Sequence, residues 1–133
     1  MTGERIKDQA TRYAALAIMI AGAFLRLNQY AANRSLWLDE AMLALNIVNR
    51  SFVNLLGPLD YSQGAPIGFL LVQKTMVTAF GGEDFVLRIF SVMTALAALY
   101  LMYRVSFRYV GSIGGLIALG LFSLSGPMIY YAS

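Results

Sequence analysis

The residues of this sequence best suited to chemistry are two adjacent acids, Asp39 and Glu40, in the stretch "RSLWLDEAML" between strongly apolar segments. A carboxylate at a membrane surface can act as a general base, or bind a divalent cation that holds a phosphate leaving group. The same acids can instead cap the N-terminus of a helix, where they accept hydrogen bonds from free N–H groups and favour the positive end of the dipole. The residue types leave both interpretations open.

Two basic residues in apolar surroundings, Lys74 and Arg88, are the next candidates. A cation at the outer membrane surface could bind the phosphate of a lipid. Each residue also has an ordinary interpretation. Lys74 could be a solvated residue on an interfacial helix, and Arg88 could extend its side chain to the interface while its stem stays in the apolar region.

Composition limits the chemistry to carboxylates, Lys, Arg, Tyr and the backbone. The chain has no Cys and no His, which excludes a thiol nucleophile, an imidazole base, a disulfide framework and a zinc site of the usual ligands. Ten Lys and Arg stand against seven Asp and Glu. These charges are scattered instead of forming a basic tract, so we expect no nucleic acid partner.

The elements that must position these residues are predicted to form an all-α integral membrane protein. Of its 133 residues 59% are apolar, and the mean hydropathy is +0.64, whereas ordinary soluble domains are roughly 45–50% apolar. Three apolar stretches predict three transmembrane helices, over about 13–30, 85–103 and 110–132. We expect one membrane domain over 1–133.

The first predicted span ends near Arg26, which is expected to extend its charge toward the interface. A secretory signal peptide also has a basic start and a short apolar run, and this alternative stays open. In the third predicted span, Gly114, Gly115 and Gly120 would let another helix approach closely.

Between the first two spans, residues 31–84 are predicted to form one long loop with two interfacial helices, over about 39–56 and 66–80. Asn46, Asn49 and Arg50 recur on one face of the first of these helices, while apolar residues share another. Lys74 stands at the centre of the second, which is too short and too polar there to span a membrane.

Basic residues decide the predicted topology. The N-terminal segment is basic, and Arg104 and Arg108 follow the second predicted span. Under the positive-inside rule both regions are cytoplasmic, which places residues 31–84 outside a plasma (inner) membrane. Five of the seven acids then lie on the outer face.

The order of several short motifs resembles the start of the GT-C membrane glycosyltransferases. An Arg ends the first apolar helix; "WLDEA", "APIGF", an Arg opening the next apolar helix and finally "PMIYYAS" follow along the chain. More narrowly, the pattern is similar to the family that includes protein O-mannosyltransferases and the lipid A aminoarabinose transferase. It covers the chain from about residue 10 onward and implies a partial GT-C fold.

The resemblance implies a role for each candidate residue. Asp39 matches the acid taken as catalytic base or metal-associated group, and Glu40 is its catalytic neighbour. Arg88, with Lys74 as a second candidate, would bind the phosphate of a polyprenyl-phosphate-linked sugar donor. A divalent cation, Mg²⁺ or Mn²⁺, could bind at Asp39. Tyr130 and Tyr131 match an aromatic pair of the family. The expected partners are membrane lipid, the donor and an acceptor.

The sequence also departs from the family pattern. Where relatives often carry an acid or His before the Pro, this chain has "QGAP", and it stops at Ser133, where the family's Q-E-A-R segment would begin. We therefore expect the N-terminal portion of such an enzyme, inactive alone. The alternative is a small non-catalytic membrane protein that assembles with partner membrane proteins through its third span.

Overall fold

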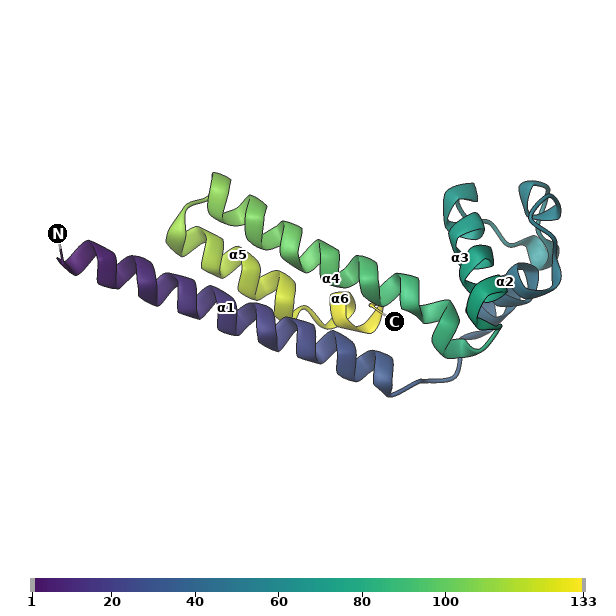
Figure 1. Cartoon of the computed structure of the whole chain (residues 1–133), viewed down its shortest axis with the longest axis horizontal. Helices are drawn as coiled ribbons and strands as arrows, with labels where there is room; N and C mark the ends of the chain where they lie inside the picture. Colours follow the sequence, from purple (N-terminus) through teal and green to yellow (C-terminus); the bar gives the residue numbers. More distant parts are fainter. Residues whose placement is uncertain (1, 133) are drawn as a thin grey trace. The chain divides into compact units, whose positions relative to one another are not determined.

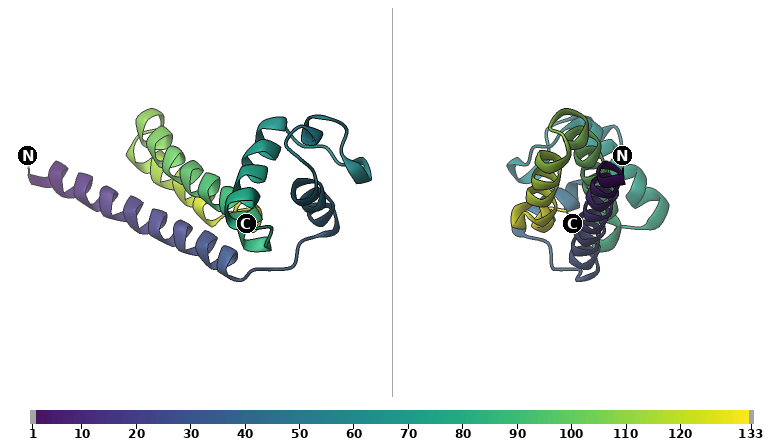
Figure 2. Two further views of the ribbon diagram at one scale, coloured as in Figure 1. Left: turned by 45° about the vertical axis from the view of Figure 1, so that its right-hand side comes forward. Right: turned by 90° about the vertical axis from the view of Figure 1, so that its left-hand side faces the viewer.

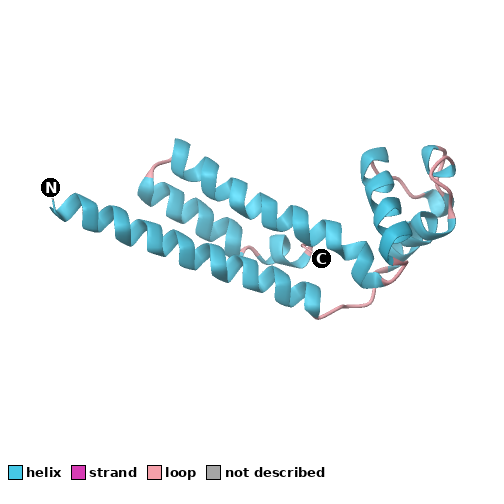
Figure 3. Ribbon diagram, in the orientation of Figure 1, coloured by secondary structure: helices cyan, strands magenta, loops and turns pink. Residues whose placement is uncertain are grey.

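The computed structural model describes residues 2–132, and within this range the ordered elements are all helical, with no strand (Figures 1 and 3). The prediction of an all-α chain is confirmed. The α-helices are α1 (Thr2–Ala31), α2 (Leu38–Asn49), α3 (Ile67–Phe80), α4 (Asp84–Tyr109), α5 (Ser112–Leu124) and α6 (Gly126–Tyr130). Two short 3-10 turns lie between α2 and α3, η1 (Asn54–Leu56) and η2 (Asp60–Ser62).

Packing groups the residues into two compact units, and the expectation of one membrane domain stays a prediction. The bundle unit consists of the residues up to Ala32 and from Ser91 onward, and the loop unit is Asn33–Phe90. Figures 1 and 2 show α1, α5 and the second part of α4 side by side in the bundle unit, where Ala15, Leu99 and Leu119 form its core. The loop unit has its own core, made of Ile47, Leu70, Val77 and Leu87.

Two helices are long and apolar enough to cross a membrane, Gln9–Ala31 within α1 and Asp84–Tyr109, which is α4. They contain the first two predicted spans. With 23 and 26 residues they exceed the roughly 20 residues that a bilayer core requires.

Beside its apolar core, the bundle unit buries several polar side chains and exposes many large apolar ones, unlike a water-soluble bundle. Arg26, Ser106 and Ser123 are buried. Large apolar residues face outward along α1, namely Tyr13, Leu16, Ile20, Phe24 and Leu27. Soluble proteins bury apolar residues and leave charged ones in water.

The third predicted span is not one helix. Helix α5 ends at Leu124, Ser125 adopts an extended conformation with φ −63° and ψ 117°, and α6 then begins with Gly126 and Pro127. Proline has no N–H to donate and its ring clashes with a preceding helical turn, so it favours a new helix start over the continuation of α5. At 13 residues, α5 is roughly 20 Å long.

Arg26 satisfies the carbonyl groups that this break leaves free. Its guanidinium donates to the Ser123 carbonyl at 3.1 Å, to the Phe122 carbonyl at 3.3 Å and to the Gly22 carbonyl at 2.9 Å. The last carbonyls of a helix have no partner within it, and a cation there also meets the negative end of the helix dipole. The expectation that Arg26 extends to the interface is wrong, because the side chain is 1% exposed.

Gly22 allows α1 to lie close to α5 at this point. A Cβ atom at position 22 would stand 2.9 Å from the Cβ of Ser123, closer than two such atoms pack. Arg26 is one turn further along α1, so the missing side chain at Gly22 brings the guanidinium within reach of the end of α5.

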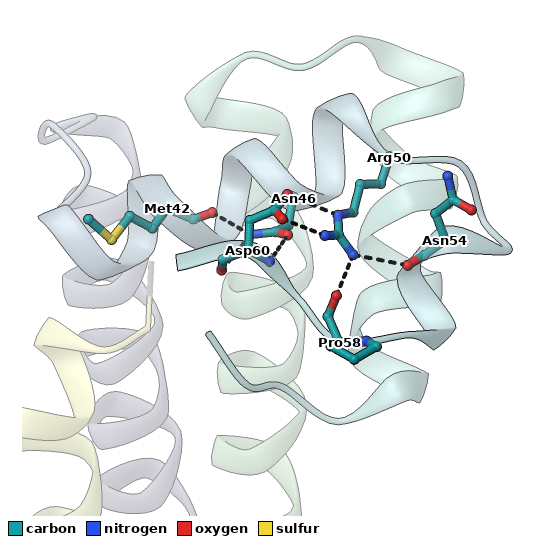
Figure 4. A network of polar contacts seen from close by, with 6 residues as sticks. All are labelled: Met42, Asn46, Arg50, Asn54, Pro58 and Asp60. Atoms are coloured by element: carbon teal, nitrogen blue, oxygen red, sulfur yellow. Dashed lines mark hydrogen bonds and ion pairs between the residues drawn. The ribbon is translucent and has the colours of Figure 1, made fainter. Parts of the chain in front are cut away.

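The first interfacial helix is shorter than predicted, since α2 ends at Asn49 and not near residue 56. Figure 4 shows the cause. The Arg50 guanidinium forms an ion pair with Asp60 at 2.7 Å and donates to the carbonyls of Asn54 and Pro58 at 3.1 and 2.7 Å. These contacts with the following loop are made by a residue in an extended conformation, at φ −90° and ψ 152°.

The polar face of α2 lies inward. Asn46 is 2% exposed, accepts from the Asp60 N–H at 2.8 Å and donates to the Asp60 carbonyl at 3.3 Å. Leu45 and Val48, on the apolar face, are exposed. Helix α2 therefore contacts the loop through Asn46 and places Ile47 in the core of the unit, while Leu45 and Val48 remain exposed.

Two glycine substitutions test the contact between α1 and α5. Gly22→Ala forces Ser123 to shift, whereas Gly120→Ala meets nothing within 4 Å. We expect Gly22→Ala to be less stable than Gly120→Ala by about 1–3 kcal/mol, the usual effect of overpacking. Unfolding in detergent followed by far-UV circular dichroism measures the difference; equal stabilities would show that the two helices do not pack closely at Gly22.

Candidate functional site

The two acids that opened the sequence analysis lie in the first turn of α2, and they have different environments. Glu40 reaches back and accepts the backbone N–H of Trp37 at 3.0 Å. This is the acidic half of a capping box, in which the third helical residue satisfies an N–H at the helix start. Capping is therefore carried by Glu40. The Asp39 carboxylate is exposed, and no described residue forms a hydrogen bond or ion pair with it.

The residues around Asp39 are a poor fit for the expected Mg²⁺ or Mn²⁺. Within the described range no three His, Cys, Asp or Glu side chains gather into a group that could hold a metal ion. Because Glu40 is engaged by Trp37, a cation at Asp39 would have one protein carboxylate as its ligand. Such a donor set is too small to hold the ion by itself, so no step below is assigned to a metal.

Lys74 has a structural partner. Its ammonium donates to the Val48 carbonyl at 3.0 Å, close to the C-terminal end of α2. A cation at this position satisfies a free carbonyl and favours the negative end of the helix dipole. Lys74 thus ties α3 to the end of α2, and its predicted role in phosphate binding stays a prediction.

Arg88 is the unusual residue of the loop unit. It lies in the second turn of α4 and is 3% exposed. Nε and both terminal nitrogens of its guanidinium are buried and have no hydrogen-bond partner among the described residues. A side chain that extends to the interface would place these nitrogens in water, so the ordinary interpretation of Arg88 is not what the structure shows.

The start of α4 is held firmly, and this fixes where Arg88 lies. The buried Gln73 of α3 donates its amide N–H to the Leu87 carbonyl at 2.7 Å. The ring of Phe69 meets that of Phe90 edge to face, with centroids 5.9 Å apart. Both contacts join α3 to α4 on either side of Arg88 along the chain, so the backbone of this residue has little freedom.

A buried guanidinium without acceptors is energetically unfavourable. Its five N–H donors require oxygen partners, and burial of an uncompensated charge costs several kcal/mol. The planar fork of Arg matches the oxygens of a phosphate or carboxylate in a bidentate manner. The arrangement is therefore suited to binding an anion.

The structure brings Asp39, Glu40, Lys74 and Arg88 into the same loop unit. No hydrogen bond or ion pair among the described residues joins an acid of α2 to Lys74 or Arg88, so a site shared by Asp39 and Arg88 stays a prediction. Tyr130 and Tyr131 lie in the bundle unit with their rings edge to face, 5.0 Å between centroids.

Sequence reasoning missed two buried polar residues that organise the fold. Gln73 lies beside Lys74 in the polar centre of 66–80, which was interpreted as interfacial, and Arg26 was expected at a helix end. The same signal was available for both, namely a polar residue within an apolar run. Removing such a residue from water is costly unless it finds a specific partner elsewhere in the chain.

No protein-family model, curated protein or solved structure matches this chain. The resemblance to the GT-C glycosyltransferases therefore depends on the sequence motifs alone.

A pair of alanine substitutions separates the two acids. Both carboxylates favour the helix dipole, but only Glu40 accepts the Trp37 N–H. Glu40→Ala should destabilise the loop unit by about 0.5–1.5 kcal/mol more than Asp39→Ala, the net value of one hydrogen bond. Trp37 is the single tryptophan of the chain, so its fluorescence reports this unfolding directly. A larger loss from Asp39→Ala would reverse the assignment and make Asp39 the cap.

Proposed function

We propose that this chain forms the N-terminal part of a membrane glycosyltransferase that takes a sugar from a polyprenyl-phosphate carrier on the outer face of the plasma membrane. The observation that carries the proposal is the buried guanidinium of Arg88, whose nitrogens have no partner in the described chain. A polyprenyl phosphate offers what this site lacks, a phosphate attached to an apolar chain.

The apolar surface of the loop unit supports a site at the membrane boundary. Beside Leu45 and Val48 of α2, the exposed residues include Val53 and Leu56 around η1 and Ile67 at the start of α3. Apolar side chains that face outward on short helices are typical of elements that lie in the membrane interface. A lipid carrier would reach Arg88 from the same environment.

In the proposed reaction, Asp39 and Arg88 act at opposite ends of the transferred group. The Asp39 carboxylate, which has no hydrogen-bond or ion-pair partner among the described residues, accepts the proton of the acceptor hydroxyl. The acceptor oxygen then bonds to the anomeric carbon, and the bond between that carbon and the phosphate oxygen breaks. The polyprenyl phosphate leaves with an added negative charge, which Arg88 stabilises. Glu40 positions Asp39 through the cap of α2.

Loss of the Arg88 charge tests the proposal. Arg88→Gln should weaken binding of a polyprenyl monophosphate to the chain in neutral nanodiscs by about 10-fold or more, since charged hydrogen bonds contribute about 1.5–3 kcal/mol. Native mass spectrometry can count the bound lipid, with the polyprenyl alcohol of the same length as the uncharged control ligand.

Lys74→Gln is the matched control, because it removes one positive charge from the same unit at a residue that binds the Val48 carbonyl. Binding by Lys74→Gln should stay within about 3-fold of the parent, since a half-buried charge already held by a backbone carbonyl adds less than about 1 kcal/mol to phosphate binding. Equal binding of the phosphate by the parent and Arg88→Gln would remove the basis of the proposed function.

The proposed membrane topology places the N-terminus in the cytoplasm and the loop unit outside. Two candidate spans, α1 and α4, lie between the basic N-terminal segment and Ser112. A cysteine placed at Ser62 should react with a membrane-impermeant maleimide in intact cells, and one at Ser112 should react only after lysis. Both positions are exposed, whereas Ser106 is 2% exposed and would resist the reagent on either side. Labelling of Ser112→Cys in intact cells would invert the topology.

The second candidate function, a non-catalytic protein that assembles with other membrane proteins, is favoured by the outer face of α5. An apolar row is exposed there and includes Ile113, Ile117 and Leu121, and Gly120 has open space beside it. Gly115, however, is already covered within the chain by Phe107, whose ring atoms would lie 3.2 Å from an added Cβ. Retention of a partner protein in the absence of phosphate binding would favour this function.

A further inference from the structure

The last turns of α4 carry two adjacent rows of side chains with different chemistry. Tyr100, Arg104 and Arg108 recur at intervals of four residues and share one row, while Leu101 and Val105 form the row beside them. Together with Tyr109 these residues line an open depression of about 320 Å³. Leu101 and Val105 are 59% and 51% exposed, so the apolar row is available to a ligand.

The two guanidinium groups are oriented by aromatic residues and not by acids. Arg104 donates to the Tyr100 hydroxyl at 2.8 Å, and its guanidinium carbon lies 5.8 Å from the centre of the same ring. Arg108 lies 5.9 Å from the ring centre of Tyr109. No described carboxylate pairs with either Arg, and the sequence has no Asp or Glu after Asp84.

Two like charges one turn apart on a helix repel each other. An anion that binds between Arg104 and Arg108 removes this repulsion and gains charge-assisted hydrogen bonds. The neighbouring Leu101 and Val105 require a ligand that is apolar just beside its anionic group, and the exposed Tyr rings suit the boundary between headgroups and acyl chains. A free phosphate supplies only the anion. An anionic phospholipid supplies the anion, an apolar chain beside it and a position at the boundary between headgroups and acyl chains.

We propose that this basic and aromatic face of α4 is a binding site for an anionic phospholipid of the cytoplasmic leaflet. Arg104 and Arg108 hold the headgroup phosphate, Tyr100 positions Arg104, and the acyl chain lies along Leu101 and Val105. The site belongs entirely to the bundle unit and is independent of Arg88 and of the proposed transfer reaction. It would anchor the end of α4 in one leaflet.

The test compares the phosphatidylglycerol retained per protein in native mass spectrometry after purification from vesicles of phosphatidylcholine with phosphatidylglycerol. The double variant Arg104→Met, Arg108→Met should retain about 25-fold less, because each basic residue near an anionic surface contributes about a factor of five. The double variant Arg5→Met, Lys7→Met removes the same charge from the N-terminal segment and should retain as much as the parent. Millimolar inorganic phosphate should not displace the lipid.

Tyr100→Phe keeps the charge and the ring but releases Arg104, so it should reduce retention about 2- to 5-fold, while Tyr13→Phe on α1 should change nothing. If the double Arg variant does not fold, Arg108→Met alone decides the question with an expected loss of about 5-fold. Equal retention by the parent and the folded Arg variants would overturn the proposal. So would an equal loss in Arg5→Met, Lys7→Met, which would mark a general attraction to basic charge.

Discussion

A guanidinium group buried among apolar side chains must have oxygen acceptors, and this constraint connects the fold of the chain to its proposed function. Among the side chains that the structure describes, two arginines are almost completely buried, Arg26 at 1% and Arg88 at 3% exposed. The two terminal nitrogens of Arg26 find acceptors in the carbonyls that the break after α5 leaves free, while its Nε has no partner among the described residues. Arg88 finds none in the described chain. The first arginine therefore links α1 to the end of α5, and the second is the basis of the proposed function.

In the loop unit a less buried guanidinium, that of Arg50, also has oxygen acceptors. Arg50 binds Asp60 and two loop carbonyls, and Asn46 pairs with the backbone of Asp60 from the neighbouring turn of α2. These polar contacts fold a turn-rich segment against α2, while apolar residues of α2 and η1 remain exposed. Besides its apolar core, the unit is therefore held together by buried polar contacts, and it leaves several large apolar side chains exposed, an arrangement that suits the surface of a bilayer better than water. Such a surface would bring a lipid-linked substrate to Arg88.

Sequence patterns predicted the features that depend on local composition. The helical class of the chain follows from the apolar runs, and both long apolar helices lie where hydropathy placed them. The patterns failed where a distant partner decides the conformation. The end of α2 depends on Asp60, ten residues after Arg50. The burial of the Arg26 side chain depends on the carbonyl of Ser123, almost a hundred residues away. Local signals identified Asp39, Glu40, Lys74 and Arg88 as candidates, but only the folded chain separates the capping Glu40 and the helix-binding Lys74 from the unpartnered Asp39 and Arg88.

The central claim is that the buried Arg88 guanidinium receives the phosphate of a lipid carrier, and an experimental density map of the chain in nanodiscs with a polyprenyl phosphate tests it most directly. We expect density for the phosphate with its oxygens about 2.7–2.9 Å from the guanidinium nitrogens, the distance of charge-assisted hydrogen bonds, and the apolar chain leading away toward the bilayer. A map in which a protein carboxylate or carbonyl occupies those nitrogens, with the lipid phosphate elsewhere, would contradict the account.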